Sequence, residues 1–209
     1  MEFSTWLTFF AASWAISISP GPGAIASMSA GLNHGFRYGY VTIFGLVLGI
    51  WTQLLIVGVG LGALVATSAT AFTVVKWFGV GYLVWLGIAQ WRAPARPMVA
   101  ASDSGEVVSQ RSLVLRAWMI NVVNPKGTVF LLAVVPQFIS LGQPLLSQYL
   151  IIGATLAFTD LVVMTGYTAL ASRVLGALKE PAHIRAMNRT FGGLFVLAGS
   201  LLALFKRSS

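Results

Sequence analysis

Six long apolar stretches dominate this sequence and constrain what it can fold into. They cover residues 3–30, 39–66, 71–91, 113–139, 148–172 and 190–205. A helix that crosses a bilayer needs about 20 apolar residues, so six such helices would take up about 120 to 140 of the 209 positions. Only 9% of the residues are charged, against about 25% in an ordinary soluble domain. We therefore expect an all-α integral membrane protein with six transmembrane helices.

The same composition excludes several classes of function. A hydrophobic content of 57% does not fit a soluble enzyme core or a disordered chain. The net charge of +8 is spread over the loops rather than gathered in one patch, so we expect no nucleic-acid partner. The chain has no cysteine, and its two histidines, His34 and His183, are both assigned to loops. This leaves no residues for a thiolate nucleophile, an iron–sulfur cluster or a zinc site, and we expect no cofactor and no metal.

The positions of the basic residues predict how the chain is oriented in the membrane. Cytoplasmic loops carry an excess of Lys and Arg. Nine basic residues fall in the first, third and fifth loops, namely Arg37, Arg92, Arg96, Arg111, Arg116, Arg173, Lys179, Arg185 and Arg189. The opposite side carries three, namely Lys76, Lys206 and Arg207. We therefore expect both termini on the outer, periplasmic side.

The third loop predicts how the chain is divided. It is the longest polar segment and contains Pro94, Pro97, Asp103 and Glu106. We expect a single transmembrane domain over residues 1–209, with half-repeats at about 1–92 and 113–209 and a cytoplasmic linker at 93–112. Since each half has an odd number of helices, the halves must enter the membrane in opposite directions, as two inverted three-helix repeats.

Each half opens with an interrupted apolar stretch. The first stretch contains Ser19-Pro20-Gly21-Pro22-Gly23, and the fourth contains Asn124-Pro125-Lys126-Gly127. Proline removes a backbone donor and breaks a helix, and matching breaks in inverted halves point to the binding site of a transporter. The alternative is a pair of ordinary proline kinks, which membrane helices tolerate. We expect broken first and fourth helices, with a substrate site formed by Pro20, Gly21, Pro22, Gly23, Asn124, Pro125 and Lys126.

Two charged residues lie near the middle of predicted spans, Lys126 in the fourth and Asp160 in the fifth. A charge in the bilayer costs roughly 2.5 to 3.5 kcal/mol on insertion scales, so both residues are candidates for function. The alternative is a purely structural ion pair. We expect Lys126 to orient the substrate and Asp160 to carry a coupling proton, because an apolar environment disfavours a charged carboxylate and eases its protonation.

The free backbone groups at a helix break suit a small zwitterion. A half-helix N-terminus favours an anion such as a carboxylate, and free carbonyls suit an ammonium group. Ser19, Gln53 and Asn121 are candidates for additional polar lining. One sequence does not reveal which helical faces they occupy, so their role stays open.

These residues, in this order, resemble the LysE/RhtB family of bacterial amino-acid exporters. The likeness covers nearly the whole chain except the linker. It runs through residues 19–23, 31–37, 76–79, 82–87, 124–126, 136–138 and 160–167. The segments at 32–35, 90–93, 136–139 and 191–195 are closest to the homoserine-exporting branch of that family.

The resemblance implies a secondary exporter that works by alternating access in the bacterial cytoplasmic (inner) membrane. The implied substrates are homoserine, homoserine lactone and threonine, and the implied driving force is the proton gradient. The expected partners are therefore the amino acid, protons and membrane lipid, and a homo-oligomer is compatible with them. A passive channel for small solutes is one alternative. A membrane-embedded enzyme is another, but it would need a nucleophile–base pair inside the bilayer, so we do not expect an enzyme.

Overall fold

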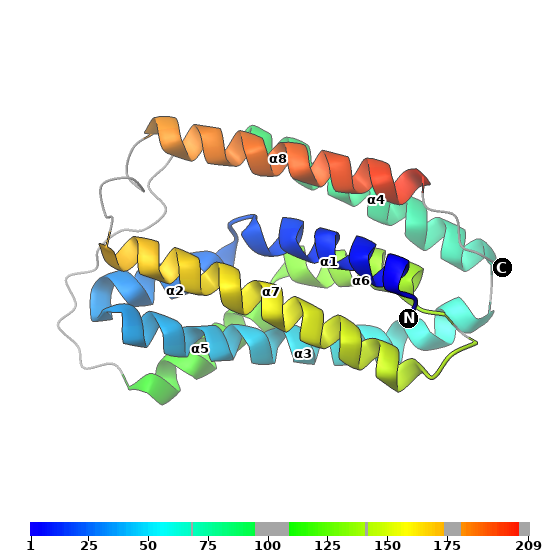
Figure 1. Cartoon of the computed structure of the whole chain (residues 1–209), viewed down its shortest axis with the longest axis horizontal. Helices are drawn as coiled ribbons and strands as arrows, with labels where there is room; N and C mark the ends of the chain where they lie inside the picture. The colour runs from blue at the N-terminus through cyan, green and yellow to red at the C-terminus, as the bar shows by residue number, and fades with distance from the viewer. Residues whose placement is uncertain (68, 95–108, 141, 174–180, 205–209) are drawn as a thin grey trace.

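The computed structural model describes residues 1–67, 69–94, 109–140, 142–173 and 181–204. Eight helices and no strand occur in these residues (Figure 1). They are α1 (Phe3–Ile18), α2 (Pro22–His34), α3 (Phe36–Thr67), α4 (Ala69–Trp91), α5 (Gln110–Val122), α6 (Pro125–Phe138), α7 (Leu145–Arg173) and α8 (Pro181–Leu204). The all-α expectation is confirmed for this part of the chain.

The first interruption separates α1 from α2. Ser19 leaves the helical conformation, with φ −66° and ψ 118°, and Gly21 is extended, with φ −143° and ψ −170°. Pro22 then opens α2. Proline suits the first position of a helix because the missing N–H would have had no partner there. The chain therefore stops and restarts a helix within three residues.

The second interruption separates α5 from α6. Asn124 caps α6, because its side-chain oxygen accepts a hydrogen bond of 3.1 Å from the backbone N–H of Lys126. Pro125 takes the first helical position, as Pro22 does in α2. The axes of α5 and α6 differ by 54°. The expected helix breaks are thus present in both halves.

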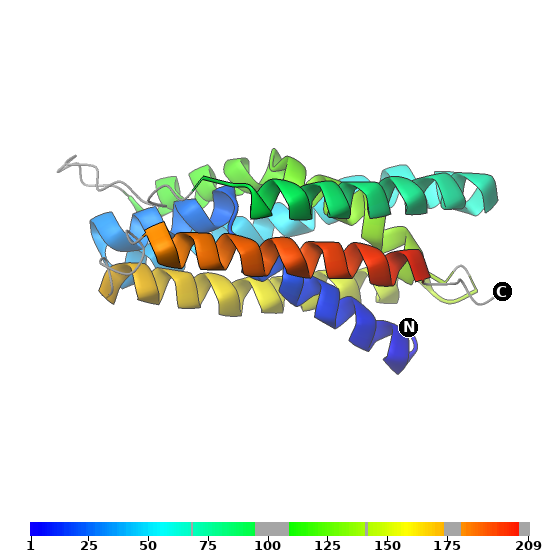
Figure 2. The ribbon, with the colours of Figure 1, turned by 90° about the horizontal axis from the view of Figure 1, so that it is seen from above.

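The two interrupted helices run past each other in opposite directions. Helix α1 contacts α6, and α2 contacts α5, so the two breaks lie side by side near the middle of the molecule (Figure 1). Helix α3 contacts both interrupted helices, and α7 packs against α1, α2 and α3. The long helices α3, α4, α7 and α8 run along the long axis of the molecule (Figure 2). This arrangement brings the four half-helix ends at the breaks together.

Helices α4 and α8 form an outer pair, which lies along the top of Figure 1. A Cβ atom built on Gly87 would lie 2.7 Å from the carbonyl oxygen of Gly192, so the backbones touch where both residues lack a side chain. Small residues allow this kind of close approach between helices. The start of α1 and the end of α8 lie at the same end of the molecule (Figure 1).

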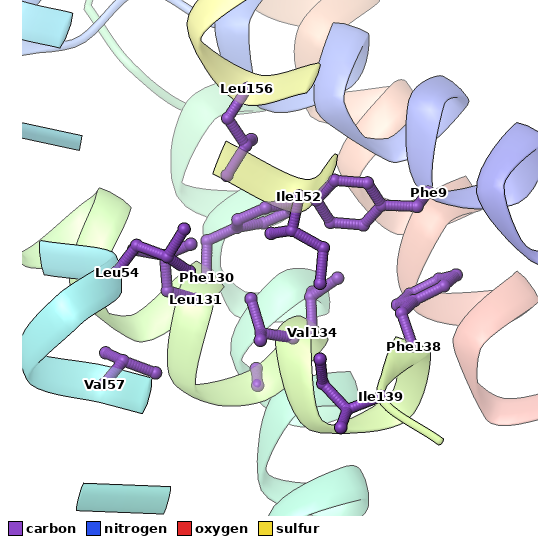
Figure 3. Close-up of a cluster of buried hydrophobic side chains, with 12 residues drawn as sticks. Phe9, Leu54, Val57, Phe130, Leu131, Val134, Phe138, Ile139, Ile152 and Leu156 are labelled. Atoms are coloured by element: carbon purple, nitrogen blue, oxygen red, sulfur yellow. The ribbon is translucent and has the colours of Figure 1, made fainter. Parts of the chain in front are cut away.

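Two buried apolar clusters hold the central helices together. The first joins α1, α3, α6 and α7 (Figure 3). The rings of Phe9 and Phe138 pack edge to face in it, with 5.3 Å between the ring centroids. The second joins α2, α3, α5 and α7 around Met28, Ile43 and Met164. Between them lies the region of the breaks. The core is therefore divided in two at the level of the predicted substrate site.

By length and apolar composition, two described helices can cross a membrane, over Phe36–Gly60 and Leu145–Ala171. The bent pair α5 and α6 makes a third span if both helices count as one. Phe3–Ile18 and Val80–Ala89 are apolar but shorter. The structure thus has two to three candidate spans, and six spans in two inverted repeats stay a prediction.

Several predicted boundaries were wrong. Helix α8 begins at Pro181 rather than near residue 190, so Arg185, Arg189 and His183 lie on a helix and not in a loop. His34 is the last residue of α2, and the turn to α3 is the single residue Gly35, with φ 87°. The reason is that hydropathy marks only the apolar part of a helix, whereas helical hydrogen bonding continues through polar turns.

The linker prediction falls mostly outside the described residues. Residues 95–108 are not among them, nor are Lys179, Lys206 and Arg207. At the linker's far end, α5 already begins at Gln110 rather than at 113. The single-domain division of the chain therefore stays a prediction.

Candidate functional site

A cavity lies where the two helix breaks meet. It is lined by Ile16, Ser17, Ser19, Gly21, Gly23, Ala24, Leu46, Ile50, Gln53, Asn121, Asn124, Lys126, Gly127, Phe130, Leu131, Leu156, Asp160 and Met164. The space open to the centre of a water-sized sphere is about 70 Å³. One water needs about 10–15 Å³ on that measure, so the cavity has room for about five to seven waters or one small solute.

Lys126 links the two breaks through its ammonium group. It is the second residue of α6, and its Nζ donates hydrogen bonds to the carbonyl oxygen of Ile16 at 3.2 Å and to that of Ser19. Carbonyls at the end of a helix have no intrahelical partner and carry partial negative charge. The ammonium group of one half therefore satisfies the free carbonyls of the other half.

Asp160 supplies the opposite charge from α7. It lines the same cavity as Lys126, and the two charges attract each other. Its Oδ2 atom is buried and has no hydrogen-bond partner among the described residues. The same holds for Oγ of Ser19, another residue of the lining. Buried polar atoms normally have a partner, so these two atoms can still bind a ligand.

Gln53 closes the second break. Its Nε2 lies 2.8 Å from the carbonyl oxygen of Asn121 and 3.1 Å from that of Asn124, and 2.9 Å from Oγ1 of Thr128. An amide nitrogen has two hydrogens to share among these acceptors. Gln53 therefore stabilises the backbone at the break, in addition to lining the cavity.

The N-termini of α2 and α6 differ in their caps. The start of α6 is capped by Asn124, whereas no side chain caps the start of α2. Gly21, Gly23 and Ala24, at the start of α2, line the cavity. The partial positive charge of a helix N-terminus is thus directed at the cavity by α2.

The structure brings most of the predicted site residues together. Those in the lining are Ser19, Gly21, Gly23, Gln53, Asn121, Asn124, Lys126 and Asp160. Pro20, Pro22 and Pro125 are not among the lining residues of this cavity. Pro22 and Pro125 instead take the first positions of α2 and α6. Whether the lining residues bind a substrate or carry a proton stays a prediction.

Tyr167 is a residue that the sequence analysis missed. Its hydroxyl donates a hydrogen bond to the carbonyl oxygen of Ile18, the last residue of α1. Tyr167 lies seven residues after Asp160, and this spacing puts both residues on one face of α7. That spacing was the available signal. The apolar part of the lining, such as Leu46 and Phe130, had none, since any apolar helix offers such residues.

A second and larger cavity lies between α2, α3 and α5. The space open to the centre of a water-sized sphere is about 520 Å³ in this cavity. Its lining includes Pro22, Ser29, His34, Ser112 and Arg116. Of these, His34 is the last residue of α2 and Ser112 is near the start of α5, and these helix ends lie at one end of the molecule (Figure 1). Both cavities are lined by residues of α2 and α5, and neighbouring residues such as Ile120 and Asn121 line different cavities.

Comparison with known proteins identifies the family. The family model described as "LysE type translocator" matches residues 14–205. The chain belongs to this family. A homoserine/homoserine lactone efflux protein of Salmonella typhimurium is 45% identical to this LysE-type protein over 203 residues, which cover 97% of this chain and 98% of the relative.

Other relatives of this LysE-type chain are more distant or less well described. An uncharacterized membrane protein of Vibrio cholerae is 43% identical over 99% of this chain and all of its own length. A leucine efflux protein of an Enterobacter strain is 27% identical and covers 94% of this chain and 93% of its own length. No solved structure matches the chain. It is a membrane protein of a translocator family, and the enzyme alternative is set aside.

Proposed function

We propose that this protein is a secondary active exporter of small neutral amino acids and their derivatives, namely homoserine, homoserine lactone and threonine. The observation that carries the proposal is that one cavity is lined by both helix breaks, a cation and an anion. The extended identity to a homoserine/homoserine lactone efflux protein supports this substrate class. The cavity volume suits a molecule of that size.

The charged groups suit the two ends of a zwitterion. Lys126 attracts the carboxylate, and the uncapped start of α2 adds backbone N–H groups to that end. Asp160 attracts the ammonium and exchanges a proton with the solution, which couples export to the proton gradient. Oγ of Ser19 has no partner among the described residues and suits the hydroxyl of homoserine. Homoserine lactone has no carboxylate and binds through its amine.

Alternating access requires the molecule to open on one side at a time. In the proposed transporter, α1 to α4 and α5 to α8 are two inverted repeats, with six spans in the bacterial inner membrane and both termini in the periplasm. The antiparallel pairing of the two interrupted helices supports this arrangement. The two apolar clusters would open in turn, and the larger cavity would lead in from the cytoplasm.

Efflux from loaded proteoliposomes tests the proposal. The purified protein is reconstituted with a panel of amino acids inside, and a pH gradient is imposed. We expect homoserine to move against its concentration gradient and an uncoupler to abolish this movement. Downhill movement that an uncoupler does not affect would instead indicate a passive channel.

A further inference from the structure

The ammonium of Lys126 marks a site that suits ammonium groups in general. Nζ is bound by the carbonyl oxygens of Ile16 and Ser19, and the Asp160 carboxylate attracts it from α7. Two carbonyls and a nearby carboxylate make the surroundings that a protonated amine requires, because an ammonium group has three donors and no acceptor. The site is built by the end of α1 together with Asp160 on α7, and Lys126 reaches these carbonyls with its terminal ammonium group.

We infer that the Ile16 and Ser19 carbonyls and Asp160 form an ammonium-binding subsite, which Lys126 and the α-ammonium of the substrate occupy in turn. This inference rests on the proposed function in one respect, namely that the natural ligand of the cavity is an amino acid. The inference adds a competition within the site. The substrate ammonium displaces Lys126 from the two carbonyls, and Lys126 then attracts the substrate carboxylate.

The charge balance favours this exchange. Lys126 and Asp160 neutralise each other, and a zwitterion brings no net charge. When the substrate ammonium takes the carbonyls and Asp160, the freed lysine pairs with the substrate carboxylate, so every charge keeps a partner. An unpaired charge in an apolar site is costly, so a ligand with only one of the two charges fits less well.

The lysine side chain already lies beside the start of α2. A Cβ atom built on Gly21 would lie 3.5 Å from Cδ and 3.6 Å from Nζ of Lys126, so the side chain passes over a residue without a side chain of its own. Gly21 directly precedes α2, whose uncapped N-terminus favours a carboxylate. A short swing of Nζ along this backbone would exchange the end of α1 for the start of α2.

The inference predicts opposite effects of one substitution on two ligand classes. When the Lys126 ammonium occupies the two carbonyls for about nine-tenths of the time, the apparent affinity for an added amine is about tenfold lower than for an empty subsite. In Lys126→Gln, methylammonium should therefore bind about tenfold more tightly than in the unchanged protein. Homoserine should bind more weakly, since its carboxylate loses a partner. Titration calorimetry on the full-length protein in nanodiscs measures both affinities.

Two controls separate this competition from simple charge repulsion. Tetramethylammonium has the same charge as methylammonium but no N–H, so its affinity should change less on Lys126→Gln. An equal gain for both cations, or no gain for methylammonium, would overturn the inference. Arg92→Gln also removes one positive charge, at the exposed end of α4, and should leave both affinities unchanged.

A structure of the unchanged protein with homoserine tests the same point without a variant. The ligand ammonium should lie within hydrogen-bond distance of the Ile16 and Ser19 carbonyls, with Nζ of Lys126 moved to the carboxylate. Lysine still bound to both carbonyls, with the ligand ammonium elsewhere, would contradict the exchange. A protein that shows the amine effects but binds no amino acid would support the subsite and contradict the proposed function.

Discussion

At the scale of single residues, similar polar side chains have different surroundings in the same cavity. Gln53 and Ser19 were both candidates for polar lining. Gln53 is engaged with the carbonyls of Asn121 and Asn124, so it stabilises the second break. The hydroxyl oxygen of Ser19 has no partner among the described residues. Of the two, Ser19 therefore has more capacity left for a ligand.

Asp160→Asn tests the proton role at this scale. The amide cannot exchange a proton, so homoserine exchange between equal pH values should continue while accumulation driven by a pH gradient is lost. The measurement is uptake and efflux in proteoliposomes at equal protein content. Thr165→Val is a matched control on α7, because the Thr165 hydroxyl bonds to the backbone of its own helix. Accumulation that survives in Asp160→Asn would contradict the proton role.

The double variant Lys126→Ala, Asp160→Asn tests the structural alternative. If the two residues only neutralise each other, removing both should restore what each single substitution loses. We expect no restoration of pH-driven export, because the double variant lacks the proton carrier and the group that attracts the carboxylate. Recovered export in the same proteoliposome assay would show that the pair is structural.

At the scale of helices, each break is completed by residues from the other half of the chain. Lys126 and Tyr167 bind the carbonyls at the end of α1, and Gln53 on α3 binds those at the end of α5. The free carbonyls of a helix end must find a partner when water is excluded. This mutual capping couples the two halves where a transporter would have to change shape.

Tyr167→Phe removes one of these caps. The Ile18 carbonyl loses a buried hydrogen-bond partner, which lowers the free energy of unfolding by about 1 to 3 kcal/mol. We therefore expect a lower midpoint of thermal unfolding in detergent and slower homoserine export. Tyr149→Phe, on the same helix but in the first apolar cluster, should have the smaller effect on export. An equal loss of export in both variants would argue against a special role of this cap.

Replacing Pro20 and Pro22 together by alanine tests the first break itself. Alanine restores two backbone N–H groups, so α1 and α2 can join into one continuous helix and withdraw the Ile16 and Ser19 carbonyls from Lys126. We expect normal membrane insertion and strongly reduced efflux. Pro144→Ala, in the short turn before α7, is the control. Normal export by the double variant would show that the break is only a kink.

At the scale of the whole molecule, several described arginines and the larger cavity lie at the same end. Arg37, Arg92, Arg111 and Arg185 are close to the helix termini there (Figure 1). The cavity that contains Arg116 opens between α2 and α5 at that end. The positive-inside rule predicts that this end faces the cytoplasm, where the proposed exporter would collect its substrate.

Single cysteines test this orientation, because the natural chain has none. Ser112→Cys places a thiol in the larger cavity, and Ser147→Cys places one near the start of α7 at the opposite end. A membrane-impermeant maleimide should label Ser147→Cys in cells with a permeabilised outer membrane and Ser112→Cys only in inside-out vesicles. The reverse pattern would invert the proposed topology.

The sequence alone determined the helical class, the two breaks and the two charged residues inside apolar stretches. These features follow from local properties: the length of an apolar stretch, the missing N–H of proline, and the cost of a charge in lipid. The family also followed from short motifs in a defined order, and the match over residues 14–205 confirmed it. Each of these can be read from neighbouring residues.

Only the tertiary structure decided which groups meet. Lys126 contacts carbonyls more than a hundred positions earlier in the chain, and Asp160 reaches the same cavity from α7. The role of Gln53, the bond from Tyr167 to Ile18 and the larger cavity depend in the same way on how α2, α3, α5 and α7 pack. The physical reason is that the sequence of an apolar helix does not show which of its faces packs against which neighbour. The packing of distant helices determines which carbonyls and charges become partners.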